Sequence, residues 1–213
     1  MDLHLVRHGQ TAWNAERRIQ GQLDSELDEL GREQARALRP VLGGLDLGAV
    51  YCSTSGRARE TLALAVETLP GHVDYRDELR EIRLGVWQGR LWSEVEYESP
   101  AMVEALRDVS DEFDVEGAES YAELQRRGVA AIERIVDERA AETVLVVSHG
   151  ALLKSVLAHY TGHALSELRS LPSLPNCAHS VLEVSGERRE VVSIAGRAVR
   201  GGDWDRARRE SAS

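Results

Sequence analysis

The run Thr143 to Val147 is the feature of this sequence that most restricts its fold. These residues form a short, continuous apolar segment rich in β-branched side chains. Such a segment is typical of a strand that is buried on both faces within a parallel sheet. Parallel strands are joined by crossover segments that usually contain a helix, so strands and helices should alternate along the chain. The run therefore predicts an α/β fold.

The remaining sequence follows this alternation. Further strands are predicted at residues 3–6, 49–53 and 72–75, and helices at residues 28–42, 57–69, 121–135 and 151–160. Residues 180–184 and 190–194 are predicted to form an antiparallel edge hairpin, and the polar tail from Gly201 is expected to fray. The pattern predicts one domain over residues 1–213, a three-layer α/β/α structure with a mostly parallel central sheet and an antiparallel edge strand.

An acidic insert at about residues 90–120 interrupts this alternation of strands and helices. Between Glu94 and Glu119 there are ten acidic residues and one basic residue, Arg107, in a chain whose net charge is −10. We expect the insert to form a helical lid over the functional site. The negative charge argues against nucleic acid as a partner, because a polyphosphate needs a basic surface.

The sequence gives no sign of a membrane segment. No apolar run approaches the roughly 20 residues that span a bilayer, and residues Met1 to His4 lack the basic flank and apolar core of a signal peptide. A cytoplasmic protein without a membrane partner is therefore expected. Cys52 and Cys177 have apolar or strand-like neighbours, which is typical of buried free thiols.

Basic residues follow three of the predicted strands. Arg7 and His8 come directly after the first strand, Arg57 comes shortly after the second, and His149 follows the fourth. The carboxyl ends of parallel strands meet at one edge of a sheet, so these side chains should converge. Guanidinium groups and helix N-termini match the oxygens and the charge of a phosphate. The sequence therefore predicts a phosphate-binding site at this edge.

The same residues give the chain a resemblance to the histidine phosphatase superfamily, which includes the phosphoglycerate mutases. The resemblance extends from Leu3 to about Ser180 and rests on four motifs in family order. They are Leu5-Val6-Arg7-His8-Gly9-Gln10-Thr11-Ala12-Trp13-Asn14 with Arg18, Gln20-Gly21 and Asp24; Ser53 with Arg57-Ala58 and Thr61; Leu79-Arg80-Glu81; and Val147-Ser148-His149-Gly150.

The resemblance implies a role for each catalytic group. His8 would attack phosphorus and form a phosphohistidine, while Glu81 would exchange a proton with the leaving alcohol and then with water. Arg7, Arg57 and a protonated His149 would hold the phosphoryl oxygens and stabilise their charge. Four further residues would bind the phosphate or its ester oxygen, and we call them the second group of ligands: Asn14, Gln20, Gly21 and Gly150.

The resemblance implies no metal and no other cofactor. His159 and His163 stand four residues apart, as metal ligands can, but they lack the acidic residue of a His-Glu-x-x-His motif. The expected partner is a small-molecule phosphomonoester, and a homodimer is left open. Asn176 matches a family position and fits a turn equally well.

The role of the aromatic residues near the insert is open between two alternatives. Trp87, Trp92 and Tyr97 either wall the substrate pocket or pack the insert. An apolar setting for Glu81 is expected from three nearby side chains: Leu84, Val86 and Trp87.

The predicted function is hydrolysis of a phosphomonoester. The acid motif from Glu81 to Gly89 is similar to that of the phosphatase branch, and the acidic insert would repel a bisphosphate unless its carboxylates point outward. The substrate would be a small metabolite of the sugar phosphate or phosphoglycerate type, and residues 20–27 resemble actinobacterial glucosyl-3-phosphoglycerate phosphatases. Two alternatives remain: a bisphosphoglycerate-dependent phosphoglycerate mutase, and an inactive relative that binds phosphorylated ligands.

Overall fold

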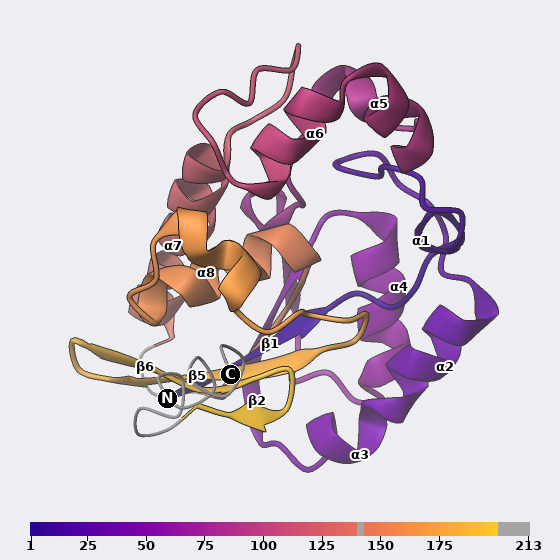
Figure 1. Cartoon of the computed structure of the whole chain (residues 1–213). Coiled ribbons are helices and arrows are strands. Elements are labelled where there is room, and N and C mark those ends of the chain that lie inside the picture. Colours follow the sequence, from indigo (N-terminus) through magenta and orange to yellow (C-terminus); the bar gives the residue numbers. More distant parts are fainter. Residues whose placement is uncertain (140–142, 200–213) are drawn as a thin grey trace, which may run out of the picture.

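A seven-stranded mixed sheet runs through the computed structural model, which describes residues 1–139 and 143–199 (Figure 1). The strand order is β3-β2-β4-β1-β5-β6-β7. Strands β3, β2, β4 and β1 are parallel, whereas β5, β6 and β7 are antiparallel. The strands are β1 (Asp2–Arg7), β2 (Leu47–Ser53), β3 (Val73–Arg76), β4 (Thr143–Ser148), β5 (His179–Ser185), β6 (Arg188–Ile194) and β7 (Arg197–Ala198).

Helices cover both faces of this sheet. They are α1 (Ala12–Ala15), α2 (Glu29–Ala37), α3 (Arg39–Leu42), α4 (Gly56–Ala65), α5 (Trp92–Glu98), α6 (Pro100–Arg107), α7 (Tyr121–Glu138) and α8 (Gly150–Tyr160). Side chains alternate between the two faces along each strand. Leu5 and Val146 belong to the cluster that includes α7 and α8, while Val6 and Val147 belong to the cluster that includes α3 and α4. The predicted mostly parallel α/β sheet is confirmed.

The pairing of β1 with β4 positions two histidines at one edge. Arg7 lies opposite Ser148 in the parallel register. The next residues, His8 and His149, therefore leave the sheet together, and their ring centroids are 5.1 Å apart.

Three parts of the fold differ from the prediction by more than a few residues at an element's end. The expected helix over residues 28–42 is two helices, α2 and α3, because Pro40 has no N–H group to continue the hydrogen-bond ladder of the first. The helix predicted to reach Leu69 ends at Ala65, beyond which Val66 is extended. The antiparallel part has three strands because the short β7 adds to the predicted hairpin. The tail from Gly201 lies outside the described residues.

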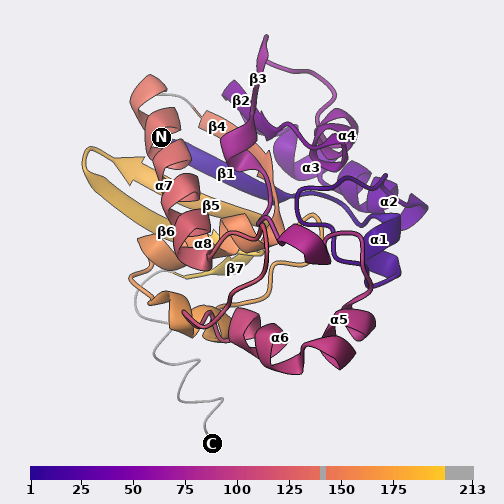
Figure 2. The same ribbon diagram turned by 90° about the horizontal axis from the view of Figure 1, so that it is seen from above.

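The acidic segment contains α5 and α6. Figures 1 and 2 show these two helices outside the sheet, with α5 towards α1 and α6 towards α7 and α8. Val95, Val103 and Leu106 are buried beneath them. Nine of the ten acidic side chains between residues 94 and 119 are exposed, and the buried tenth, Glu119, pairs with Arg127 at 2.7 Å. Glu96 lines a cavity beneath α5, where it pairs with Arg107 at 2.9 Å, and none of the ten acidic residues lines the cavity at His8. The structure therefore gives little basis for the predicted repulsion of a bisphosphate.

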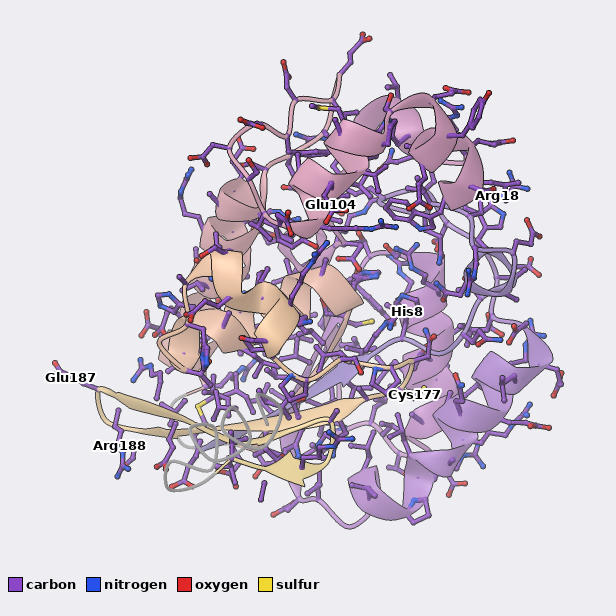
Figure 3. All side chains as sticks on the ribbon, in the orientation of Figure 1. His8, Arg18, Glu104, Cys177, Glu187 and Arg188 are labelled. Carbon is purple, nitrogen blue, oxygen red and sulfur yellow. The ribbon has the colours of Figure 1, made fainter. Side chains whose placement is uncertain are left out.

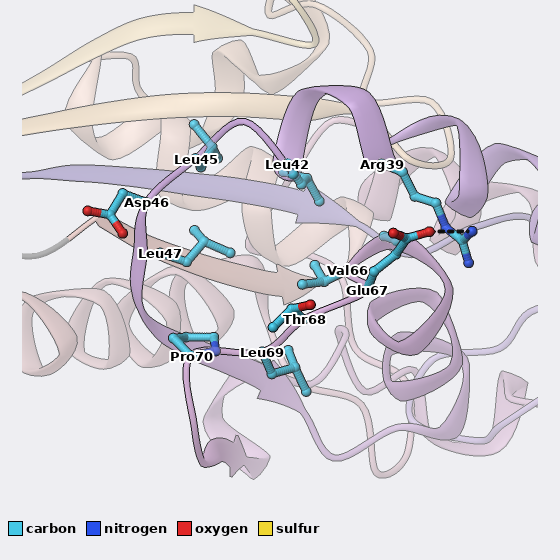
Figure 4. Close-up of a pocket in the computed structure, with 12 residues that line it drawn as sticks. Arg39, Leu42, Leu45, Asp46, Leu47, Val66, Glu67, Thr68, Leu69 and Pro70 are labelled. Carbon is cyan, nitrogen blue, oxygen red and sulfur yellow. Dashed lines mark hydrogen bonds and ion pairs between the residues drawn. The ribbon is translucent and has the colours of Figure 1, made fainter.

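The structure contains a further cavity away from the predicted site residues. A cavity of about 460 Å³ lies between α3, the start of β2 and the end of α4, with the Arg39–Glu67 ion pair at its side (Figure 4). It contains none of the predicted site residues.

Within residues 1–139 and 143–199, no helix has the length and hydropathy needed to cross a membrane.

Candidate active site

The predicted basic residues do converge at the carboxyl ends of β1, β2 and β4. A cavity of about 200 Å³ is lined there by Arg7, His8, Arg57 and Glu81, together with residues of α1 and of the segment that follows it. Figure 3 shows His8 near the middle of the molecule, below α5 and α6. Four segments distant in sequence thus contribute to one site.

His8 is held so that one ring nitrogen is defined as a donor. Its Nδ1 lies 2.7 Å from the carbonyl oxygen of Gly9, which can only accept, so Nδ1 carries the proton and Nε2 has the lone pair in the neutral ring. The imidazole is buried. Burial, followed by the charges of Arg57 and Arg7, lowers the pKa of His8 well below its usual value. His8 is therefore a neutral imidazole with Nε2 as its acceptor atom.

Arg57 is a fully buried cation that contacts His8 directly. Its Nε donates to His8 Nε2 at 3.3 Å, and its Nη2 donates to the carbonyl oxygen of Gly21 at 2.8 Å. Its Nη1 donates to the carbonyl of Leu23 at 2.7 Å and pairs with Asp24 at 3.0 Å. These contacts fix the guanidinium beside the nucleophile candidate.

Arg7 and His149 contribute buried polar atoms that have no partner. Arg7 Nη1 donates to the carbonyl of Leu174 at 2.6 Å, but its Nε has no hydrogen bond among the described residues, and the same holds for His149 Nδ1. Buried polar groups are rarely left unpaired, and oxyanions bind where such donors converge. A Cβ atom on Gly150 would lie 3.2 Å from Arg7 Nε, so glycine leaves room for the guanidinium.

The protonation of His149 differs from that expected. Its Nε2 lies 2.8 Å from Ser53 Oγ. Burial, followed by the charges of Arg57, His8, Arg7 and Arg80, lowers the pKa of His149 well below its usual value. The ring is therefore neutral in this structure. The charge of a phosphate ester would favour the protonated form that the sequence predicted.

Glu81 lies at the N-terminus of α8. One carboxylate oxygen accepts from the N–H groups of Ile82 and Leu152 at 2.9 and 3.1 Å, and the other accepts from that of Ala151 at 3.1 Å. The N–H groups of Ala151 and Leu152 belong to the first turn of α8, where they have no partner within the helix. The apolar wall beside Glu81 comes from Ile82 and Leu84.

The second group of predicted ligands lies in the same region. Asn14, Gln20 and Gly21 line the cavity with His8, and Gln20 Oε1 is buried without a partner among the described residues. Asn176 Nδ2 donates to the carbonyl of His8 at 3.1 Å and to Asn14 Oδ1 at 3.3 Å. Asn176 is therefore a positioning residue as well as part of a turn.

The structure resolves the alternatives for the aromatic residues. Trp92 lines the cavity, as do Leu106 and Tyr121. Trp87 is buried and packs edge-on against Phe113 at a centroid distance of 5.6 Å. Tyr97 is 89% exposed and does neither. Of the three side chains expected beside Glu81, Leu84 lines the cavity with it, whereas Val86, which is 58% exposed, and Trp87 do not line it.

Three residues have structural roles that the sequence did not assign. Asp24 pairs with Arg57 and accepts from the Gly56 N–H at the start of α4. Thr61 Oγ1 accepts from the Gly9 N–H at 2.9 Å. Arg80 Nη2 donates to the carbonyl of Gln22 at 2.6 Å, while its Nε is buried and unpaired among the described residues. All three stand inside the four motifs, which is the only signal the sequence carries for them.

Comparison with known proteins identifies the family. The model of the histidine phosphatase superfamily (branch 1) matches residues 3–196. The chain belongs to the histidine phosphatase superfamily. The match includes all four motifs, so the resemblance predicted from the sequence is confirmed.

Curated relatives of this histidine phosphatase include both enzyme types that the sequence left open. A metal-independent phosphoserine phosphatase from Arabidopsis thaliana is 35% identical over 84% of this chain and 76% of its own length. A probable phosphoglycerate mutase, GpmB from Erwinia tasmaniensis, is 32% identical over 84% of this chain and 83% of its own length.

Solved structures of similar proteins agree with the fold. YhfR from Bacillus stearothermophilus has a TM-score of 0.86 and 36% identity, covering 93% of this chain and 98% of its own. A mycobacterial glucosyl-3-phosphoglycerate phosphatase has a TM-score of 0.81 and 29% identity, covering 92% and 99%. The phosphatases among these relatives support phosphomonoester hydrolysis by this histidine phosphatase.

Proposed function

We propose that this protein hydrolyses small phosphomonoesters through a phosphohistidine on His8. The observation that carries the proposal is the geometry of that ring. Since Nδ1 donates to Gly9, the lone pair on Nε2 is the one available to attack phosphorus. The lowered pKa of His8 keeps the ring neutral and therefore nucleophilic at and below neutral pH.

In the first step, Nε2 of His8 forms a bond to phosphorus as the bond to the leaving alcohol oxygen breaks. Arg57 Nε, which donates to Nε2 across 3.3 Å, would turn to a phosphoryl oxygen as the substrate binds. Arg7 Nε and His149 Nδ1 would donate to the other oxygens, which would satisfy two buried atoms that are otherwise unpaired. These groups act mainly by electrostatic stabilisation of the transition state.

Glu81 would act as the proton carrier. In its protonated form it gives a proton to the leaving alcohol. In the second step, its carboxylate takes a proton from the water that attacks phosphorus and releases phosphate from His8. The three backbone N–H groups that donate to it hold the carboxyl group in place beside the cavity.

We infer that the reaction needs no metal ion. The cavity is lined by three cationic side chains, Arg7, Arg18 and Arg57. They disfavour a further cation and supply the charge neutralisation that a divalent ion would otherwise provide. The Arabidopsis relative is named as metal-independent. Asn14, Gln20, Gly21 and Gly150 are proposed to complete the phosphate site.

The alternative is a phosphoglycerate mutase, in which a second hydroxyl group takes the phosphoryl group from His8. The carboxylates of the lid do not line the cavity at His8, which weakens the electrostatic argument against it, and the GpmB relatives favour it. Purified protein should be assayed with 3-phosphoglycerate, with and without bisphosphoglycerate, beside a panel of phosphomonoesters and in the presence of a chelator. The proposal predicts release of phosphate that the chelator does not reduce. Isomerisation faster than every hydrolysis would contradict it.

A further inference from the structure

A second cavity extends the catalytic one beneath the lid. It has a volume of about 570 Å³ and lies between the residues that follow α1 and the helices α5 and α6. The two cavities share three lining residues, Trp92, Leu106 and Tyr121. These shared residues place the second cavity, which we name the lid cavity, next to the site of His8.

The charged side chains of the lid cavity are almost all paired. Glu16 accepts from Arg18 Nε at 2.9 Å, and Glu96 accepts from Arg107 Nη1 at 2.9 Å. Arg17 also lines the cavity, and it makes no ion pair or side-chain hydrogen bond with any residue that the structure describes. Arg17 is thus the one charged side chain of this lining that has no ion pair among the described residues, and it is exposed to solvent beside indole, phenol and leucine side chains.

The backbone of Arg17 is held in a conformation that does not suit arginine. Its φ angle is 54°, in the left-handed region that favours glycine. The Arg17 N–H donates to the carbonyl of Asn14 at 3.2 Å, and its carbonyl accepts from the N–H of Trp92, the first residue of α5, at 3.0 Å. The position is fixed between α1 and the lid. Glycine would adopt this backbone conformation with less strain. The arginine at this position is therefore explained by a role of its side chain.

We propose that Arg17 recognises a carboxylate on the alcohol part of the substrate, which makes Arg17 a specificity-determining residue of the lid cavity. This inference rests on the proposed phosphatase function. The preferred substrates are then phosphomonoesters of hydroxy acids, in which the phosphate binds at His8 and the carboxylate reaches the guanidinium of Arg17. Neutral phosphomonoesters would be hydrolysed without this contact.

The test compares phenyl phosphate with 3- and 4-carboxyphenyl phosphate in the wild-type protein and in Arg17→Gln. The substitution should raise KM and lower kcat/KM for at least one carboxyphenyl ester by about tenfold or more, as for loss of a charge-assisted hydrogen bond. It should change kcat/KM for phenyl phosphate by less than about twofold. Arg17→Lys should retain part of the preference. Arg188→Gln is the matched control, since Arg188 lies far from His8 in Figure 3.

A binding measurement separates this inference from the proposed function. Calorimetric titration of the same three esters into His8→Gln and into the double variant His8→Gln with Arg17→Gln requires no turnover. Weaker binding of only the carboxyphenyl esters to the double variant supports the role of Arg17. If such binding occurred but the wild type hydrolysed none of the esters, the phosphatase proposal would fail and the Arg17 inference would stand. Equal effects of Arg17→Gln on all three esters, or no effect, would overturn the inference.

Discussion

Arg57 Nε donates to His8 Nε2 across 3.3 Å, so the proposed nucleophile and the proposed phosphate-binding cation are in direct contact. After burial, Arg57 is the largest cause of the lowered pKa of His8. The contact gives Arg57 two roles. In the proposed mechanism it would bind a phosphoryl oxygen, and it would keep the imidazole neutral as the pH falls.

Arg57→Gln should therefore change the pH profile as well as the rate. Loss of the cation raises the pKa of His8, so the acidic limb of kcat/KM should move to higher pH, because His8 is protonated and unreactive below its pKa. The rate at the optimum should fall by about a hundredfold or more. Measurement of kcat/KM between pH 4 and 8 with an aryl phosphate checks both effects. Arg32→Gln, at a half-buried ion pair with Glu60, is the control. An unmoved acidic limb in Arg57→Gln would contradict this role.

Glu81→Gln should slow the release of poor leaving groups most. A glutamine cannot give a proton to an alkoxide, whereas a nitrophenolate leaves without one. The expected loss for alkyl phosphates is about a hundredfold or more, with a smaller loss in the first step for 4-nitrophenyl phosphate. Burst kinetics across a series of leaving groups measures this slope. Glu78→Gln, which alters an acid paired with Arg134 outside the cavity, should behave as the wild type. Equal losses for all leaving groups would remove Glu81 from the acid role.

Gly31→Ala should destabilise the fold although alanine favours helices. Gly31 lies in α2, and a Cβ there would overlap the backbone of Gln10, two residues after His8. We expect the free energy of unfolding to fall by about 2 kcal/mol, which outweighs the propensity gain of about 1 kcal/mol. Urea denaturation measures this difference. Glu33→Ala, at an exposed position of the same helix, is the control and should leave the free energy of unfolding nearly unchanged. If Gly31→Ala were as stable as the wild type, α2 and the chain at Gln10 would be able to move apart without loss of stability.

The His4–His179 contact should make stability depend on pH. His4 Nδ1 lies 2.8 Å from His179 Nε2, and burial, with a smaller contribution from His4, lowers the pKa of His179 to about 4. The unfolded chain then binds more protons than the folded one between about pH 6.5 and 4. The contribution of His179 is complete above this range and is lost as the pH falls through it. In His179→Gln the free energy of unfolding should decline less steeply over this interval, whereas exposed His72→Gln should retain the wild-type slope.

The sequence predicted correctly those features that depend on hydrophobic pattern and on the order of residues along the chain. The buried run at residues 143–147 predicted β4, and the positions of Arg7, Arg57 and His149 after strands predicted their convergence. The parallel pairing of β4 with both β1 and β2 explains this convergence. Family resemblance supplied Glu81, whose place at the start of α8 no local pattern indicates. The overall arrangement and the cation cluster followed from hydrophobic pattern and motif order.

Other features depend on tertiary contacts that leave no periodic signal. The two-residue strand β7 is too short to show alternation. The direction of the lid carboxylates depends on which side of α5 and α6 packs inward, where Val95, Val103 and Leu106 occupy the buried side. The pKa of His149 depends on how tightly the other cations surround it. Asn176 reaches His8 from a turn 168 residues later in the chain.

The most direct test of the central claim is the identity of the phosphorylated residue. Wild-type protein should be mixed with a radiolabelled phosphomonoester, quenched in alkali during the first turnover, and mapped by mass spectrometry. The account predicts a label that is stable in alkali, labile in acid and confined to Nε2 of His8, and it predicts none in His8→Gln. Label on any other residue, or full hydrolytic activity in His8→Gln, would contradict it.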